Sequence, residues 1–199
     1  MNEWRLIIHT SFPILLTLIR LIISPVVMPF LLVLVMPWNN FILNILLASL
    51  FVLFALTDFF DGYLARKYHL ETQLGALLDP MADKFLLCGV LIGLVYVQKI
   101  FFLWALLFLV RELYVTGLRL IAAERAHKIT VSFSGKIKTT LQYLYLTIVI
   151  ANVRSGNFYP LAHFDMIENI LMIAAVSMTL ISAYWYTMKF LENTKGMEL

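Results

Sequence analysis

Residues 57–86 read TDFFDGYLARKYHLETQLGALLDPMADKFL, and this stretch lies between long apolar segments. It contains four aspartates: Asp58, Asp61, Asp79 and Asp83. Charged side chains are rare at membrane depth, and those that occur usually face a protein interior or a water-filled cavity where they have a function. Four carboxylates close together need positive charge nearby, because repulsion and desolvation otherwise favour their protonated forms. The pattern therefore predicts a site for divalent metal ions.

The composition is that of an integral membrane protein. Of the 199 residues, 62% are hydrophobic and 14% are charged, whereas soluble proteins average roughly 45–50% apolar and ~25% charged residues. Residues 21–57 contain no charged residue, which is enough for two spans of about 20 residues each. The Pro-Trp-Asn-Asn sequence at 37–40 is the only turn signal in that run. Residues 169–188 form a further uncharged span.

The expected fold is all-α: a polytopic membrane protein with six transmembrane helices. A short N-terminal interfacial helix anchored by Trp4 and Arg5 is expected before them, with no cleaved signal peptide. Residues 1–199 are expected to form a single membrane domain, and Cys88, the only cysteine, excludes an intrachain disulfide. The predicted helices cover 13–36, 41–67, 74–97, 101–124, 135–153 and 167–190.

Basic residues in the loops predict the orientation. If the N-terminus is cytoplasmic, the loops near 66–74 and 124–138 and the C-terminal end carry most of the lysines and arginines, while the opposite side has only Lys99 and Arg154. This arrangement satisfies the positive-inside rule and places the four aspartates at the cytoplasmic face. The net charge of +3 is then explained by orientation and attraction of phosphate, and no nucleic-acid partner is expected.

The spacing of the aspartates places them on two neighbouring helices. Asp58 and Asp61 are three residues apart near the end of the second helix, so they project from one helix face. Asp79 and Asp83 are four apart near the start of the third helix and do the same. Helices joined by a short loop are antiparallel neighbours, so the two pairs can converge. An all-oxygen site of this kind suits Mg²⁺ or Mn²⁺. Solvated helix ends would explain one or two of these aspartates but not four.

Small residues accompany the carboxylates. Gly62 and Ala65 follow Asp61 on the second helix, and Gly75 precedes the third-helix pair, so a bulky ligand can approach the backbone there. Small residues also permit close helix packing in membranes, and that interpretation stays open for Ala65 and Gly75. Arg66 is either a phosphate ligand, which we favour, or a topology anchor at the membrane edge.

At these residues the sequence resembles the CDP-alcohol phosphotransferase family. The family signature is Asp-x-x-Asp-Gly-x-x-Ala-Arg, eight residues, Gly, three residues, Asp, three residues, Asp, and residues 58–83 fit it without a departure. Eight fixed residues over 26 positions make the signature specific. The resemblance covers nearly the whole chain and is strongest to the bacterial branch that makes phosphatidylglycerophosphate, through LTLIR at 16–20 with Pro25, LDPMADK at 78–84, RE at 111–112 and GKIKTTLQ at 135–142.

The resemblance implies a reaction and a set of roles. The phosphatidyl group of CDP-diacylglycerol would pass to sn-glycerol 3-phosphate, giving phosphatidylglycerophosphate and CMP in phospholipid biosynthesis. Family members are commonly homodimers, and we expect a multi-pass protein of the bacterial inner (cytoplasmic) membrane with its active site facing the cytoplasm. The four aspartates would hold two divalent cations, with Asp83 also the catalytic base. The residues implied to bind the CDP-lipid are Asp58, Gly62, Ala65, Arg66 and Gly75. Chemically, any of the four carboxylates can accept the proton, and only the resemblance selects Asp83.

A phosphorylated acceptor requires a second anion site. Arg111 and Arg119 are eight residues apart on the fourth helix, roughly on one face, and Lys136 and Lys138 begin the fifth helix. A buried arginine needs a partner, which Glu112 or a ligand phosphate can supply. We expect Arg111 to bind the acceptor phosphate, with electrostatic help from the other three basic residues. Positive-inside anchoring is the alternative, most of all for Lys138.

Other functions share some of these features. Intramembrane aspartates also build cation pathways, but a cation-coupled transporter predicts charges spread through the bilayer depth, whereas in this chain they cluster around one loop. Within the family, cardiolipin, phosphatidylinositol phosphate and phosphatidylserine synthases would share the signature. The choice of acceptor depends on the region from Arg111 to Gln142.

Overall fold

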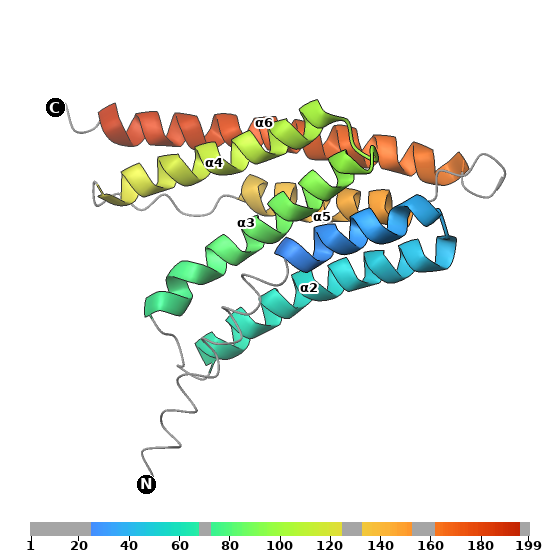
Figure 1. The fold of residues 1–199 in the computed structure, drawn as a ribbon. Helices are drawn as coiled ribbons and strands as arrows, with labels where there is room; N and C mark the ends of the chain where they lie inside the picture. The colour runs from blue at the N-terminus through green and yellow to red at the C-terminus, as the bar shows by residue number, and fades with distance from the viewer. Residues whose placement is uncertain (1–24, 68–72, 125–132, 153–161, 196–199) are drawn as a thin grey trace, which may run out of the picture. The chain divides into compact units, whose positions relative to one another are not determined.

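The computed structural model describes residues 25–67, 73–124, 133–152 and 162–195, and every regular element within these ranges is helical (Figure 1). Side chains are described except at 57–67, 73–83, 123–124, 162–164 and 193–195. A helix over residues 25–35 runs into the 3-10 turn η1 (Met36–Trp38). It is followed by α2 (Phe41–Lys67), α3 (Gln73–Tyr96), α4 (Phe102–Glu124), α5 (Phe133–Ala151) and α6 (Ala162–Lys195).

The helix boundaries agree closely with those predicted from the sequence. α2 has the predicted bounds, and α3, α4 and α5 differ by at most two residues at either end. α6 begins five residues before the predicted 167 and ends five after 190, because polar residues extend a helix beyond its apolar segment. Asp165 in the first turn of α6 favours this, since the N-terminal end of a helix attracts negative charge. The predicted interfacial helix and the first half of the predicted 13–36 helix lie outside the described residues.

The chain forms two compact units, Met1–Lys99 and Ile100–Leu199. The expectation of a single domain over 1–199 stays a prediction. In the first unit, Asn39 adopts a left-handed backbone conformation with φ 51°, which turns the chain between η1 and α2. The Asn40 side-chain oxygen then accepts the Ile42 amide N–H at 2.9 Å, which caps the start of α2.

Two glycines of α3 let the helix over residues 25–35 approach closely. A Cβ atom added at Gly89 would lie 2.5 Å from the Pro25 carbonyl oxygen, and one added at Gly93 would lie 3.1 Å from Pro29. In an α-helix the carbonyl of residue 25 normally accepts a hydrogen bond from the amide N–H of residue 29. Residue 29 is proline and has no amide N–H, so this bond is missing from the helix over residues 25–35. Because a Cβ atom at position 89 would collide with the Pro25 carbonyl oxygen, the close approach of the two helices requires glycine at this position. Met28, Leu32, Leu91 and Leu94 are buried in this part of the unit.

In the second unit, α6 contacts both α4 and α5. Figure 1 shows α4 running beside α6. The buried face of α5 recurs at helical spacing and combines polar with apolar side chains: Lys138, Gln142, Tyr145, Leu146 and Val149. The rings of Phe108 and Tyr145 are 6.2 Å apart between centroids. This face of α5 positions the polar residues described below.

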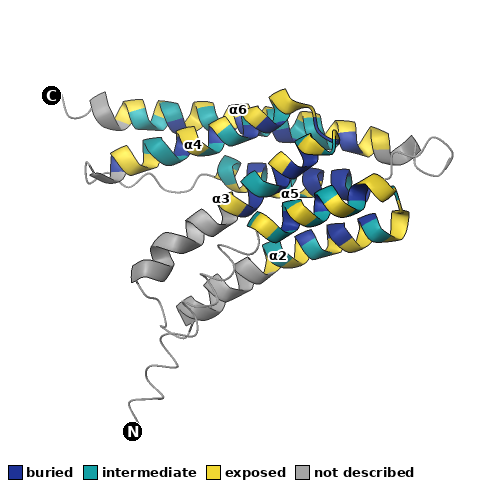
Figure 2. Ribbon diagram, in the orientation of Figure 1, coloured by how far each residue is buried: buried dark blue, intermediate teal, exposed yellow. Residues whose placement is uncertain are grey.

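Many large apolar side chains are exposed in the described part of the chain. Figure 2 shows exposed residues in yellow along the helices. On α6, Ile173, Leu180 and Tyr184 are all exposed. Within the described residues, one helical stretch is long and apolar enough to cross a membrane, Asp165–Glu192, and shorter apolar helices cover Pro25–Trp38, Phe41–Leu56 and Lys84–Tyr96. The all-α class is thus confirmed, and the number of six spans stays a prediction.

Candidate active site

The signature residues lie on two helices of the first unit that contact one another, α2 and α3. The C-terminal part of α2 carries Asp58, Asp61, Gly62, Ala65 and Arg66. The N-terminal part of α3 carries Gly75, Asp79 and Asp83. Their backbone is helical, as predicted, so the two aspartate pairs have the expected helical spacing. Their side chains lie outside the described residues, and the convergence of the four carboxylates stays a prediction.

The chemistry of this donor set fits a hard divalent cation. The signature offers four carboxylates, with no histidine or cysteine among its fixed residues. Carboxylate oxygens are the ligands that Mg²⁺ and Mn²⁺ prefer, whereas zinc sites usually include imidazole or thiolate. Which aspartates bind metal stays a prediction.

Arg111 is the best-defined of the predicted acceptor residues. Its side chain on α4 is only 9% exposed, and its Nη1 donates to Glu112 Oε1 at 3.2 Å. Its Nη2 donates to the hydroxyl of Ser182 on α6. The guanidinium carbon lies 5.8 Å from the centroid of the Tyr186 ring, at cation–π distance. Of the two partners considered for Arg111, Glu112 or a ligand phosphate, the structure shows Glu112 in contact.

Lys138 on α5 belongs to the same group of contacting side chains. We call this group the acceptor cluster, and it consists of Arg111, Glu112, Lys138, Ser182 and Tyr186. Its side chain is 1% exposed, and its Nζ donates to Glu112 Oε1, the same oxygen that accepts from Arg111. One carboxylate oxygen thus links two cationic groups from two helices. A buried lysine paired in this way differs from the exposed lysine that positive-inside anchoring alone would produce.

Two buried side-chain N–H groups on α4 and α5 have no hydrogen-bond partner within the described part of the chain. They are Arg111 Nε on α4 and Gln142 Nε2 on α5, one helical turn after Lys138. A buried donor without a partner costs about 1–3 kcal/mol, so native proteins rarely leave one unsatisfied without a ligand, water or functional reason. These two N–H groups are therefore candidate contacts for an oxygen-rich ligand.

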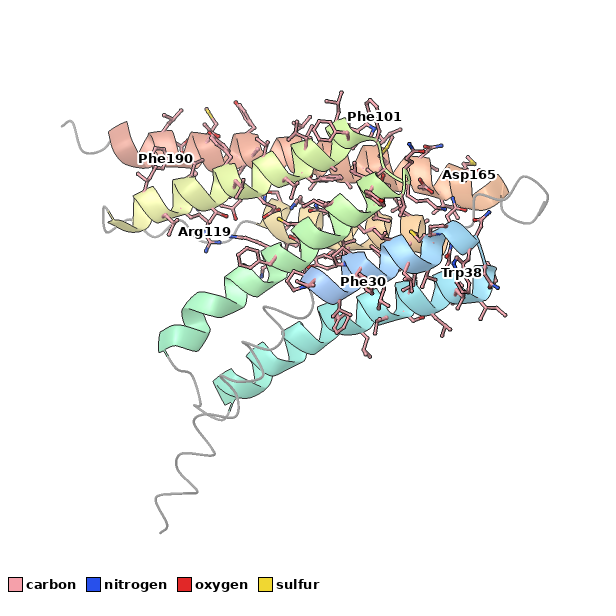
Figure 3. All side chains as sticks on the ribbon, viewed as in Figure 1. Phe30, Trp38, Phe101, Arg119, Asp165 and Phe190 are labelled. Carbon is pink, nitrogen blue, oxygen red and sulfur yellow. The ribbon has the colours of Figure 1, made fainter. Side chains whose placement is uncertain are left out.

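The structure places the other two predicted acceptor residues at the surface of the second unit. Arg119 on α4 and Lys136 on α5 are both exposed, and no ion pair joins either to the buried cluster in the described residues (Figure 3 labels Arg119). Their attraction for an anion is therefore more strongly screened by solvent and salt than that of the buried residues.

Ser182 and Tyr186, which hold Arg111 from α6, were not predicted from the sequence. Ser182 is fully buried, and its hydroxyl also donates to the Thr179 carbonyl at 3.4 Å. The available signal was a pair of hydroxyl residues, Thr179 and Ser182, three apart within the uncharged stretch 169–188 of α6. In membrane proteins such residues often make interhelical hydrogen bonds.

Comparison with known proteins defines the class. Residues 10–181 match the model of the CDP-alcohol phosphatidyltransferase family, and the chain belongs to that family. A Rickettsia felis protein named CDP-diacylglycerol–glycerol-3-phosphate 3-phosphatidyltransferase is 37% identical over 179 residues, covering 90% of this chain and 94% of the relative. A Wigglesworthia glossinidia brevipalpis protein of the same name is 40% identical over 141 residues, covering 67% and 73%. A Mycobacterium tuberculosis protein named probable phosphatidylglycerophosphate synthase is 35% identical over 184 residues, covering 92% and 83%.

Proposed function

We propose that this protein transfers the phosphatidyl group of CDP-diacylglycerol to sn-glycerol 3-phosphate, forming phosphatidylglycerophosphate and CMP. The observation that carries the proposal is the complete aspartate signature on α2 and α3, in a chain whose relatives bear the name of this transferase. The reaction makes the protein an enzyme of phospholipid biosynthesis, and its lipid substrate requires access to a bilayer.

On the donor side, Asp58, Asp61 and Asp79 would bind two divalent cations, Mg²⁺ or Mn²⁺, with Asp83 touching the second. When bound, the cations neutralise charge on the diphosphate and on the departing CMP. Gly62 and Ala65 would let the cytidine and ribose approach α2, and Gly75 would do the same at α3. Arg66 would donate to a phosphate oxygen.

In the transfer step, a hydroxyl oxygen of glycerol 3-phosphate bonds to the phosphatidyl phosphorus. The bond between that phosphorus and the oxygen of CMP breaks, and CMP leaves with the bonding electrons. Asp83 would take the proton of the attacking hydroxyl, which makes it the catalytic base. The work of the remaining residues is to align the reacting groups.

On the acceptor side, Arg111 is the residue to which we assign the phosphate of glycerol 3-phosphate. Its Nη1 and Nη2 already bond to Glu112 and Ser182, while its buried Nε–H has no partner in the described residues. Lys138 would add positive charge from α5. Arg119 and Lys136 are exposed and would attract the anion without fixing its position.

We further propose six membrane spans in a single domain over residues 1–199, with both ends in the cytoplasm, and a homodimer in the bacterial inner membrane. The exposed apolar side chains of α6 and the predominance of basic residues in the predicted cytoplasmic loops support this arrangement. Accessibility of cysteines introduced into the predicted loops, tested with a membrane-impermeant reagent, would determine the topology.

The test of the function is an acceptor comparison. Purified protein is incubated with CDP-diacylglycerol and, in separate reactions, glycerol 3-phosphate, inositol phosphate, serine or phosphatidylglycerol. We expect CMP release and a new lipid only with glycerol 3-phosphate. Selective turnover with another acceptor would reassign the protein to a different branch of the family.

A further inference from the structure

We infer that Glu112 is a positioning residue of the acceptor site, one that holds Lys138 and Arg111 in place so that the buried Nε–H of Arg111 meets the acceptor phosphate. The inference rests on the proposed function and deepens it, because the acceptor residues proposed above are all cations. Glu112 itself carries negative charge and would not touch the phosphate. It acts through the two residues that it holds.

The geometry singles out one oxygen. Glu112 Oε1 accepts from Arg111 Nη1 on its own helix, α4, and from Lys138 Nζ on α5. The Glu112 side chain is 16% exposed, so solvent only partly screens either interaction. Hydrogen bonds between ionised groups are roughly twice as strong as neutral ones, so Glu112 is a firm connection between the two helices.

Burial makes this connection necessary. The Lys138 side chain has four rotatable bonds and is almost completely buried. An ammonium group is unfavourable in an apolar interior unless a carboxylate compensates its charge. A lysine side chain also loses much rotamer freedom when it is fixed in one conformation. Glu112 supplies both the compensating charge and the fixed position.

The same two helices present the donors that a ligand can use. Arg111 Nε on α4 and Gln142 Nε2 on α5 are buried and without a hydrogen-bond partner in the described residues. Arg111 is further oriented by Ser182 and by the ring of Tyr186. Glu112 thus connects two helices that each carry one buried, unused N–H group. A small change in their relative position would misplace these donors, and a 1 Å misplacement can cost about 100-fold in rate.

A purely electrostatic role of Glu112 predicts the opposite change in binding of glycerol 3-phosphate from a positioning role. The two roles can therefore be distinguished by experiment. If the carboxylate only competed with the phosphate for the two cations, its removal would strengthen binding of glycerol 3-phosphate. If it positions them, its removal weakens binding. The sign of the change in KM therefore separates the two roles.

The experiment measures kcat and the KM for each substrate in Glu112→Gln and Glu112→Asp, with Glu192→Gln as the control, since Glu192 is an exposed glutamate of α6. We expect Glu112→Gln to raise the KM for glycerol 3-phosphate about 10- to 100-fold while leaving the KM for CDP-diacylglycerol within about twofold. Glu112→Asp keeps the charge on a shorter side chain and should recover part of this loss. Glu192→Gln should match the wild type.

A double-variant comparison tests whether the effect passes through Lys138. In a Lys138→Met background, Glu112→Gln should raise the KM for glycerol 3-phosphate by less than it does alone, because only the contact with Arg111 is then left to lose and residues that act together have non-additive effects. An unchanged or lower KM in Glu112→Gln, or an undiminished effect in the Lys138→Met background, would overturn the inference. If Glu112→Gln fails to fold, Glu112→Asp decides: a normal KM for glycerol 3-phosphate in that folded variant overturns it too. Wild-type protein that makes no phosphatidylglycerophosphate would instead refute the proposed function.

Discussion

Glu112 on α4 and Lys138 on α5 form an ion pair in which the lysine is almost completely buried. Both residues belong to helices that the sequence predicts as membrane spans. A buried ion pair is a poor source of stability, because desolvation offsets much of the attraction, but removing one partner is strongly destabilising. Its presence in this cluster is better explained by the need to hold positive charge at a fixed place.

Lys138→Met should lower the free energy of unfolding by about 3 kcal/mol, at the low end for breaking a buried pair, because Glu112 keeps Arg111 as a partner. Lys136→Met is the matched control: Lys136 is two residues away on the same helix but exposed, and its loss should change stability by no more than about 0.5 kcal/mol. Thermal unfolding in detergent measures both. Equal unfolding midpoints for the two variants would contradict the burial of Lys138.

Arg111→Ala should mainly raise the KM for glycerol 3-phosphate, by about tenfold or more, since a hydrogen bond to a charged group contributes roughly 1.5–3 kcal/mol. Arg111→Lys should not restore the KM, because an ammonium group cannot reproduce the planar contacts with Glu112 and Ser182 while presenting a further N–H. Steady-state kinetics with each substrate varied in turn provides the measurement.

The exposed Arg119 is the comparison for Arg111. Arg119→Ala should change the same KM only a few-fold, about threefold, and the change should shrink as salt is added, as expected for a screened, long-range attraction. An Arg111→Ala enzyme with an unchanged KM for glycerol 3-phosphate would show that the acceptor site is misplaced.

Gly89→Ala should destabilise the protein by about 1–3 kcal/mol, because the added methyl group would lie 2.5 Å from the Pro25 carbonyl oxygen and the helix over residues 25–35 would have to move. Gly117 provides the opposite case. An added Cβ there meets no atom within 4 Å, so Gly117→Ala should gain up to about 1 kcal/mol through helix propensity. Unfolding midpoints of the two variants should therefore move in opposite directions, and a shift of the same sign would refute this packing.

Asp83→Asn should lower turnover by about 100-fold or more, as expected for loss of a general base, while CDP-diacylglycerol binding stays measurable. Asp58→Asn should instead weaken CDP-lipid binding in the presence of Mg²⁺, because Asp58 is proposed as a metal ligand without a role in proton transfer. Calorimetric binding and single-turnover assays distinguish the two effects. Normal turnover by Asp83→Asn would remove Asp83 as the base.

Much of the fold could be predicted because its determinants are local. Predominantly apolar segments predict the helices, several of which also include charged residues, and the asparagines at 39 and 40 mark the turn before α2. α6 is longer than predicted because its helical hydrogen bonding continues through the polar residues that flank its apolar segment. The spacing of the aspartates also predicted their helical positions, since an interval of three or four residues is a local property.

The acceptor cluster could be predicted only in part, because its contacts join distant parts of the chain. Arg111 and Ser182 are 71 positions apart, and Glu112 and Lys138 are 26 apart. Helical spacing relates residues three or four positions apart, so it cannot predict contacts between residues this far apart in the sequence. Lys138 near the start of a predicted span has the sequence pattern of a topology anchor, and only the packing of α5 reveals that it is buried.

The most direct test of the central claim is the metal dependence of phosphatidyl transfer by the purified protein. The protein is first treated with EDTA and then supplied with CDP-diacylglycerol, glycerol 3-phosphate and increasing Mg²⁺ or Mn²⁺, and both CMP and phosphatidylglycerophosphate are quantified. We predict no product in EDTA and equal amounts of the two products once a divalent cation is restored. Sustained formation of phosphatidylglycerophosphate in EDTA, or CMP released without the lipid product, would contradict a metal-dependent transfer to glycerol 3-phosphate.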